Sequence, residues 1–398
     1  MNALPVAIRT VRWMVRDTFR QSLASKLFWV MLGLTAVCAL FCLSVSVRGD
    51  GPGPGHPDQL PLYVNRLDLP QIGWDKIRQD TLTGTKRDDA ARVGWEEAKR
   101  LGLKGFTLAD AERTGRDEIL RRRMETVTPE ETERAGREAV EKEGLRVVDG
   151  QVSLGFGLHT YPLRKTRENA AREVQLWLAG VVADTAGVLL ALLWTAGFLP
   201  TFLEPHAVTV LLAKPAPRWA LLVGKFAGVV LFVALHATIF VGATWVGLGV
   251  GTGVWDARYW LAVPLLVTNF AVFYAFSAFL AVCTRSTVVS VFGTLLFWLL
   301  CWAMNFTYLR VTGFPVEGLS PLSAFLVEAG YWVLPKPLDL SGIFFDAMDA
   351  QAYSMPVPEL DAVKQKNLFR PELSVLASLA FAAGVLALAA YEFRNLDY

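Results

Sequence analysis

The fold is decided by a short polar stretch between two long apolar runs, which reads Leu199-Pro-Thr-Phe-Leu-Glu-Pro-His-Ala-Val-Thr-Val-Leu-Leu-Ala-Lys-Pro-Ala-Pro-Arg218. Each flanking run is long enough to cross a bilayer, because a spanning helix needs about 20 apolar residues. Pro205 suits a helix start, whereas Pro215 and Pro217 prevent continuation. We therefore predict a short helix over about 204–213, held between two membrane spans.

The composition is that of an integral membrane protein with one polar insertion. Of 398 residues, 53% are hydrophobic and 19% are charged, and the mean hydropathy is +0.36. Soluble domains have about 45–50% apolar and about 25% charged residues. The charges concentrate in residues 48–172. The net charge of +2 gives no reason to expect a nucleic-acid partner.

The apolar runs predict six spanning helices. They are 27–47, Val174–Leu199, Trp219–Val250, Tyr259–Cys283, Val288–Leu309 and Leu373–Tyr391. Only Thr284-Arg285-Ser286-Thr287 separates the fourth from the fifth, so these two must form a tight hairpin.

Basic residues in the short loops predict the orientation in the cytoplasmic membrane. With both termini cytoplasmic, the inner face receives Arg9, Arg12, Arg16, Arg20, Lys26, Lys214, Arg218, Arg285 and Arg394. Residues 48–172 are long enough to be translocated whatever their charge. We expect a multi-pass protein with this insertion outside the cytoplasm.

These observations define the expected organisation of the chain. Residues 1–26 form a cytoplasmic amphipathic helix, with Leu4, Ile8, Val11, Val15 and Phe19 on its apolar side. The first span (27–47) precedes the extracytoplasmic domain (48–172). Spans two to five occupy 173–309 and include the cytoplasmic segment 200–218. An extracytoplasmic or re-entrant segment (310–372) leads to the sixth span and cytoplasmic tail (373–398).

Local signals predict a mainly helical insertion that ends in a hairpin. Thr107 is a candidate N-cap for a helix to about Val127. Thr128-Pro-Glu-Glu131 is a capping box whose helix should end near Glu143. Arg146 to Phe156 is interpreted as a hairpin turning at Asp149-Gly150.

The sequence offers no pattern for catalysis. Gly224-Lys225 is not a phosphate-binding loop, because Trp219 replaces its first glycine and Phe226 its Ser or Thr. The four histidines and four cysteines have no zinc-site spacing. We therefore predict no enzyme activity and no cofactor in this chain, so that any ATP would be bound by a partner.

Asp184 is the acid that lies deepest in a predicted span. Because a central carboxylate costs about 2.5–3.5 kcal/mol on insertion scales, it should face the bundle interior or water. It is either a polar group on the transport path or one end of an interhelical hydrogen bond. His236, Asn269 and Asn305 are interpreted as packing contacts between helices.

The polar stretch resembles a segment of the membrane subunits of ABC-2-type transporters. The matching residues are Leu211-Leu212-Ala213-Lys214-Pro215-Ala216-Pro217-Arg218 with Gly224-Lys225, and Arg16-Asp17-Thr18-Phe19-Arg20 running into Lys26-Leu27-Phe28-Trp29. Many members have a Gly-Thr pair before the leucines, where this chain has His206-Ala-Val-Thr209. The motifs cover about residues 9–30 and 198–228, and the architecture resembles the family over the whole chain.

The resemblance implies an all-α polytopic permease that exports a substrate with a separate ABC ATPase subunit. The chain would form a homodimer, or a heterodimer with a second permease, in the lipid bilayer. The ATPase-coupling residues would be Glu204, Leu211, Leu212, Lys214 and Arg218. A secondary transporter and a membrane-anchored receptor remain alternatives, although the chain shows no obvious repeat between its halves. The substrate is not indicated.

Overall fold

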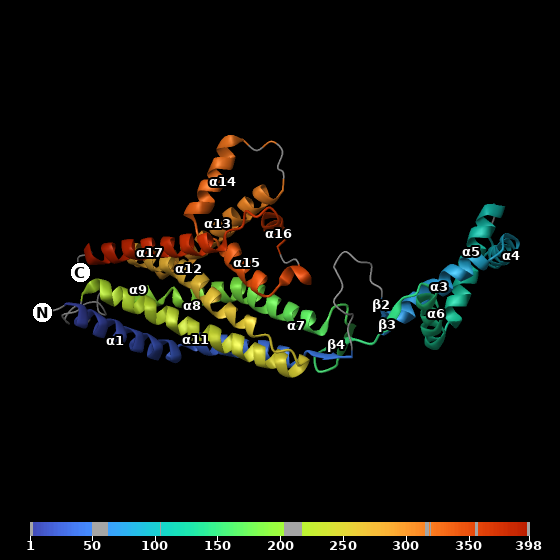
Figure 1. Cartoon of the computed structure of the whole chain (residues 1–398). Coiled ribbons are helices and arrows are strands. Elements are labelled where there is room, and N and C mark those ends of the chain that lie inside the picture. The colour runs from blue at the N-terminus through green and yellow to red at the C-terminus, as the bar shows by residue number, and fades with distance from the viewer. Residues whose placement is uncertain are drawn as a thin grey trace. The chain divides into compact units, whose positions relative to one another are not determined.

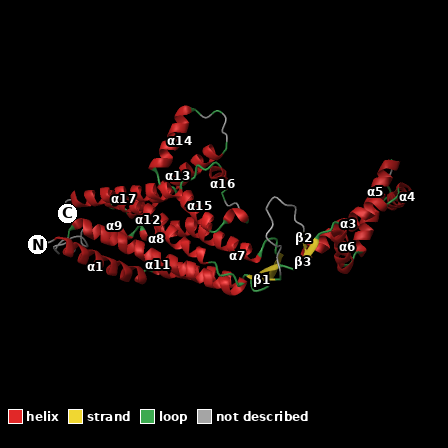
Figure 2. Cartoon of the chain, viewed as in Figure 1, coloured by secondary structure: helices red, strands yellow, loops and turns green. Residues whose placement is uncertain are grey.

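A computed structural model describes residues 3–49, 63–103, 105–202, 217–314, 318, 320–354 and 357–395. Its contacts divide the chain into two compact units. The first, here called the membrane unit, comprises Met1–Ser44 and Glu168–Tyr398, and the second, the insertion unit, comprises Val45–Arg167. Figures 1 and 2 show that helices dominate both units.

Six helical segments of the described chain are long and apolar enough to cross a membrane. They are Lys26–Ser44, Arg167–Phe202, Arg218–Thr252, Ala257–Thr284, Thr287–Gly313 and Pro371–Asn395. Each overlaps one predicted span, which confirms the predicted fold class, an all-α polytopic membrane protein. Local apolar length is enough to specify these helices, because a bilayer forces the backbone to satisfy its own hydrogen bonds.

The membrane unit begins with α1 (Ala3–Ala24) and α2 (Lys26–Ser44). Its second span combines α7 (Arg167–Gln175), the π-helix η2 (Leu176–Gly187), α8 (Val188–Thr195) and α9 (Phe198–Phe202). It continues with α11 (Arg218–Thr252), η3 (Ala257–Leu261), α12 (Ala262–Thr284), α13 (Thr287–Gly313) and α17 (Pro371–Asn395).

The tight connection between α12 and α13 forms as predicted. Arg285 adopts a left-handed conformation with φ of 53° and closes α12. The Ser286 hydroxyl then accepts a hydrogen bond from the Val289 amide at 3.4 Å and caps α13. The core of the unit centres on α12, whose Phe270, Phe273 and Tyr274 are fully buried.

Between α13 and α17 lie helices too short to span a bilayer. They are α14 (Pro321–Val333), α15 (Pro337–Ala347), η4 (Ala350–Ala352) and α16 (Pro358–Gln365). Pro321, Pro337 and Pro358 stand in the first turns, where a missing amide hydrogen costs nothing. α15 packs against η2, α12, α13 and α17, so this segment is part of the core.

In its described residues, 45–49, 63–103 and 105–167, the insertion unit has four α-helices and two small sheets. The helices are α3 (Leu69–Gly84), α4 (Arg87–Arg100), α5 (Leu108–Thr126) and α6 (Pro129–Lys142). One sheet is antiparallel and contains β1 (Ser46–Arg48), β4 (Gln151–Leu154) and β5 (His159–Pro162). The other is a parallel pair of β2 (Tyr63–Asn65) and β3 (Arg146–Val148). The short 3-10 helix η1 (Arg66–Asp68) follows β2.

Both predicted N-caps of the insertion unit are present. The Thr107 hydroxyl accepts from the Asp110 amide, and the Asp110 carboxylate accepts from the Thr107 amide, which completes a capping box. The Thr128 hydroxyl accepts from the Glu131 amide at 3.3 Å. The Glu131 carboxylate, however, forms an ion pair with Arg123 of the preceding helix, so the capping box predicted at Thr128 is formed only in its N-cap half.

Glycines bring the four helices together as two closely packed pairs, α4 with α5 and α3 with α6. Gly73, Gly94, Gly115 and Gly136 recur at intervals of 21 residues. A Cβ on Gly115 would lie 1.7 Å from the Ala90 carbonyl oxygen, and one on Gly94 would lie 1.9 Å from that of Ala111. Gly73 and Gly136 meet between α3 and α6 in the same way. Each crossing therefore depends on backbone contact that only glycine permits.

The predicted hairpin turning at Asp149-Gly150 is wrong. β3 and β4 flank this dipeptide but belong to different sheets. The Gly150 carbonyl accepts hydrogen bonds from the Asn65 side chain at 2.6 Å and the Leu163 amide at 2.9 Å, both distant in sequence. The true hairpin joins β4 to β5, and residues 155–157 supply the positive φ values that the turn requires.

Candidate functional site

The predicted ATPase-coupling segment divides into described and undescribed parts. Glu204, Leu211, Leu212 and Lys214 lie outside the described residues, whereas Arg218 begins α11. Within the membrane unit, Figure 1 places α9, the start of α1 and the end of α17 at the same end. The helices that flank the segment can therefore be analysed.

The amphipathic helix α1 packs directly on the start of α11. A Cβ on Gly224 would lie 2.9 Å from Met14 Cβ, and one on Gly228 would lie 2.8 Å from Thr18 Cβ. This spacing is the small-xxx-small pattern that lets membrane helices approach closely. The buried face of α1 comprises Ala7, Met14, Thr18 and Ser22. Ile8, from the predicted apolar stripe, is 64% exposed in the protein.

Lys225 joins three helices at this junction. Its side chain is buried, and its Nζ donates a hydrogen bond to Gln21 Oε1 of α1 at 2.5 Å. The same nitrogen lies 5.8 Å from the centre of the Phe198 ring of α9. Because a buried ammonium needs such partners, Lys225 fixes α1 and α9 against α11.

The junction extends to two further helices. Trp194 Nε1 of α8 donates a hydrogen bond to Ser25 Oγ, between α1 and α2, at 3.1 Å. Arg218 Nη1 donates to the Arg394 carbonyl oxygen near the end of α17 at 3.2 Å. We call the set Gln21, Phe198, Arg218, Gly224 and Lys225, with the helices that carry it, the coupling junction.

Asp184 connects three helices through its carboxylate. Oδ1 accepts a hydrogen bond from Asn269 Nδ2 of α12 at 2.7 Å, and Oδ2 accepts from Ser341 Oγ of α15 at 2.5 Å. Asp184 itself lies in the π-helix η2, a geometry often found at functional positions. Of the two interpretations, interhelical hydrogen bonding describes these contacts, and a place on the transport path stays a prediction.

Asp339 is a second buried carboxylate, which the sequence reasoning missed. Asn305 Nδ2 donates to Oδ1 at 2.9 Å, while Tyr331 Oη and Ser374 Oγ each donate to Oδ2 at 2.6 Å. These donors come from α13, α14 and α17. Asp339 and Ser341 both belong to α15, so this short helix is held to the bundle by two sets of buried polar contacts.

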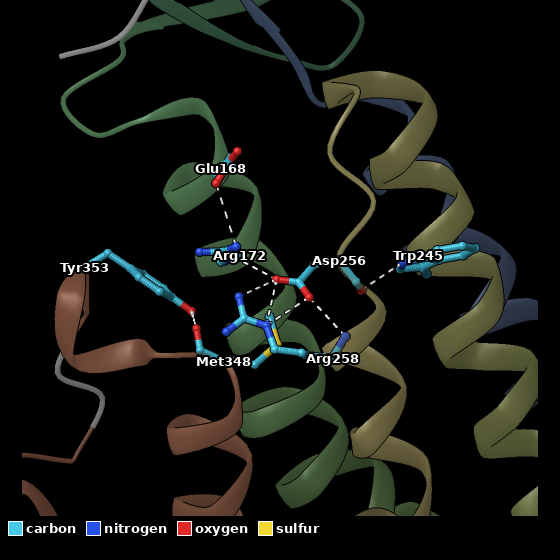
Figure 3. A network of polar contacts seen from close by, with 7 residues as sticks. All are labelled: Glu168, Arg172, Trp245, Asp256, Arg258, Met348 and Tyr353. Atoms are coloured by element: carbon cyan, nitrogen blue, oxygen red, sulfur yellow. Dashed lines mark hydrogen bonds and ion pairs between the residues drawn. The ribbon is translucent and has the colours of Figure 1, made fainter. Parts of the chain in front are cut away.

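Asp256 organises a third polar network, shown in Figure 3. Its Oδ2 accepts hydrogen bonds from Arg172 Nε and Arg258 Nη2, both at 2.8 Å, and its carbonyl oxygen accepts one from Trp245 Nε1 at 3.0 Å. Burial opposes ionisation, but the hydrogen bonds from Arg258 and Arg172 outweigh it and lower the pKa of Asp256 to about 2. The network joins the last turn of α7 to the turn after α11.

The sequence of the chain matches a known protein family. The family described as "ABC-2 family transporter protein" matches residues 13–312, which is most of the chain. The chain belongs to this family. No curated protein matches it. The protein is thus the membrane permease of an ABC transporter, and its family membership implies association with an ABC ATPase.

The structure places several of the residues that the sequence pointed to at buried contacts between helices. Gly224-Lys225, rejected as a phosphate loop, forms the centre of the coupling junction. The acid predicted in the second span, Asp184, contacts Asn269, one of the predicted packing residues. Asp339 gave only a weak signal, an acid in the first turn of an apolar segment after Pro337. In the ranges that the structure describes, no cluster of His, Cys, Asp and Glu could hold a metal ion.

Proposed function

We propose that the permease is the membrane subunit of an ATP-driven exporter and moves its substrate when a separate ATPase subunit closes on ATP. In this proposal two permease chains, identical or different, form the transmembrane pathway. Both termini and the segment 200–218 face the cytoplasm. Residues 48–172 face the other side. The permease itself binds and hydrolyses no ATP.

The coupling junction is the observation that carries this proposal. An ATPase that pulls on the segment between Phe202 and Arg218 would move α9 and α11, the helices at its two ends. Because Lys225 and Gly224 fix α1 to both, the three helices would move as one body. Packed helices transmit such a displacement as a rigid shift.

The buried carboxylates suggest how the displacement reaches the bundle interior. α9 continues from η2 through α8, and Asp184 of η2 is bonded to α12 and α15. A shift of the second span would strain these two hydrogen bonds. In the proposed cycle the Asp184 contacts exchange between two arrangements, and α15 moves with them.

The experiment expresses the tagged permease in its native host and measures the ABC ATPase retained on the purified permease. Leu211→Asp with Leu212→Asp places charge on the proposed docking helix and should abolish retention. The control, Leu103→Asp, changes an exposed leucine of the insertion unit and should leave retention intact. Full retention by the Leu211 and Leu212 variant would refute the assigned docking helix.

A second measurement separates the proposal from its alternatives. The purified permease alone should hydrolyse no ATP, and the complex should hydrolyse it at a rate that the double aspartate variant reduces. ATP turnover by the isolated chain would contradict the proposal. Transport by proteoliposomes that contain only the permease and an ion gradient would establish a secondary transporter instead.

A further inference from the structure

The hairpin formed by β4 and β5 has an unusual tip. Its loop, Gly155-Phe156-Gly157-Leu158, exposes 77% of Phe156 and 83% of Leu158. All three residues from 155 to 157 have positive φ, including Phe156 at 58°. A left-handed phenylalanine is uncommon, and such conformations gather where the surroundings or a ligand require them. The loop therefore exposes two large apolar side chains, and its left-handed backbone at Phe156 costs conformational free energy.

Strand register fixes the direction in which this tip points. β1 starts at Ser46, two residues after the first span ends at Ser44. β4 is antiparallel to β1, with Ser153 opposite Ser46 and Gln151 opposite Arg48. β4 thus runs back toward the start of β1, the end that continues into the first span. Leu154 lies one residue, about 3.3 Å, beyond the level of Ser46 in that direction, and the loop 155–158 follows it.

The composition of the hairpin differs from that of the rest of the insertion unit. From Gln151 to Pro162 the chain contains no Asp, Glu, Lys or Arg, although charged residues crowd the neighbouring helices. Tyr161 is 53% exposed on β5. The basic residues on this sheet or just after it, Arg48 on β1 and Arg164 and Lys165 after β5, lie at the other end of the sheet, where Arg164 forms an ion pair with Asp68 at 3.9 Å. An uncharged apolar tip with an exposed aromatic residue on the adjoining strand is typical of protein at a membrane interface.

We propose that the loop 155–158 inserts into the outer leaflet of the bilayer and anchors the insertion unit to the membrane surface. The proposal rests on α2 crossing the bilayer. Phe156 and Leu158 enter the boundary between headgroups and acyl chains. Insertion stops at the loop, because strands with an open edge cannot enter hydrocarbon. The Leu158 amide is already bonded to the Gly155 carbonyl oxygen, at 3.3 Å.

The test places an environment-sensitive fluorescent amino acid at position 156 of the full chain by genetic encoding, so that the native cysteines stay unchanged. The protein is reconstituted in vesicles of phosphatidylcholine and phosphatidylglycerol whose acyl chains carry bromine, a contact quencher. A second variant carries the probe at position 158. Both probes should be quenched several-fold more strongly than in vesicles of unbrominated lipid.

The control carries the same probe at Leu103, which is 51% exposed in the turn between α4 and α5. This probe should show no quenching by brominated lipid. Equal quenching at positions 103, 156 and 158 would overturn the proposal. So would a blue-shifted emission at 156 and 158 without lipid quenching, because a second protein surface would then cover the tip. Neither result depends on the ATPase, so this proposal and the proposed function can fail separately.

Discussion

Gly115→Ala offers a sharp test of the packing in the insertion unit. The added Cβ would lie 1.7 Å from the Ala90 carbonyl oxygen, and real Cβ contacts are essentially never shorter than 3.0 Å. The obstacle is backbone, so no side-chain rotation can relieve it. α5 must therefore retreat from α4 along their whole contact.

The magnitude follows from two opposing effects. Overpacking of this kind costs about 1–3 kcal/mol, and helices that separate by about 1 Å lose up to about half of the dispersion energy of their contact. Against this, alanine stabilises a helix by about 1 kcal/mol relative to glycine, because it has the higher helix propensity. We expect a net loss of about 1–2 kcal/mol, which is a factor of about 5–30 in the local opening equilibrium.

Hydrogen exchange of the full-length protein, followed by mass spectrometry, measures this opening for peptides from α4 and α5. The control is Gly84→Ala at the end of α3, where an added Cβ meets nothing within 4 Å. That variant should exchange like the parent protein or slightly more slowly. Adding Gly94→Ala to Gly115→Ala should cost less than the sum of the single changes, because the helices have already separated. Protection in Gly115→Ala equal to that in Gly84→Ala would refute the reasoning.

Three other predictions address the membrane unit and the topology. Because the pKa of Asp256 is lowered to about 2 in the folded protein, its contribution to stability should be present above about pH 4 and be lost as the pH falls toward about 2. Thermal unfolding across this range should show the loss in the parent and not in Asp256→Asn; identical pH profiles would contradict it. Lys225→Met should destabilise the protein by about 1–3 kcal/mol, because the hydrogen bond from the charged ammonium to Gln21 is lost. Adding Gln21→Leu should cost little more, and a double-mutant cycle with no coupling energy would exclude the contact. A cysteine at exposed Glu96 should react with an impermeant maleimide in intact cells whose outer barrier is permeabilised, above the background of the parent chain; reaction only after lysis would reverse the orientation.

Several features of the protein follow from local sequence alone. The six spans are specified by apolar length, since the bilayer leaves a helix as the only conformation for such a run. Thr107 and Thr128 cap their helices through residues three positions away. The connection at Arg285 and Ser286 is equally local. The neighbours that decide each feature lie within one or two turns along the chain, where a sequence pattern can be interpreted.

The regular spacing of the packing glycines in the insertion unit is also visible in the sequence, because Gly73, Gly94, Gly115 and Gly136 recur every 21 residues. Hydrophobic periodicity does not detect it, because the contact is between backbones and glycine contributes no apolar side chain. The repeat does not relate the two halves of the chain and lies within the insertion unit.

Only the tertiary structure decided the remaining features, because their partners are distant in sequence. The carbonyl of Gly150 is bonded to Asn65, which breaks the expected hairpin. Lys225 acquires its role from Gln21, 204 positions away, and Asp184 acquires its role from Ser341, 157 positions away. Asp339 is buried because four helices converge on it. A sequence states which groups must find a partner when they are buried, and the packing of the helices determines which partner each group finds.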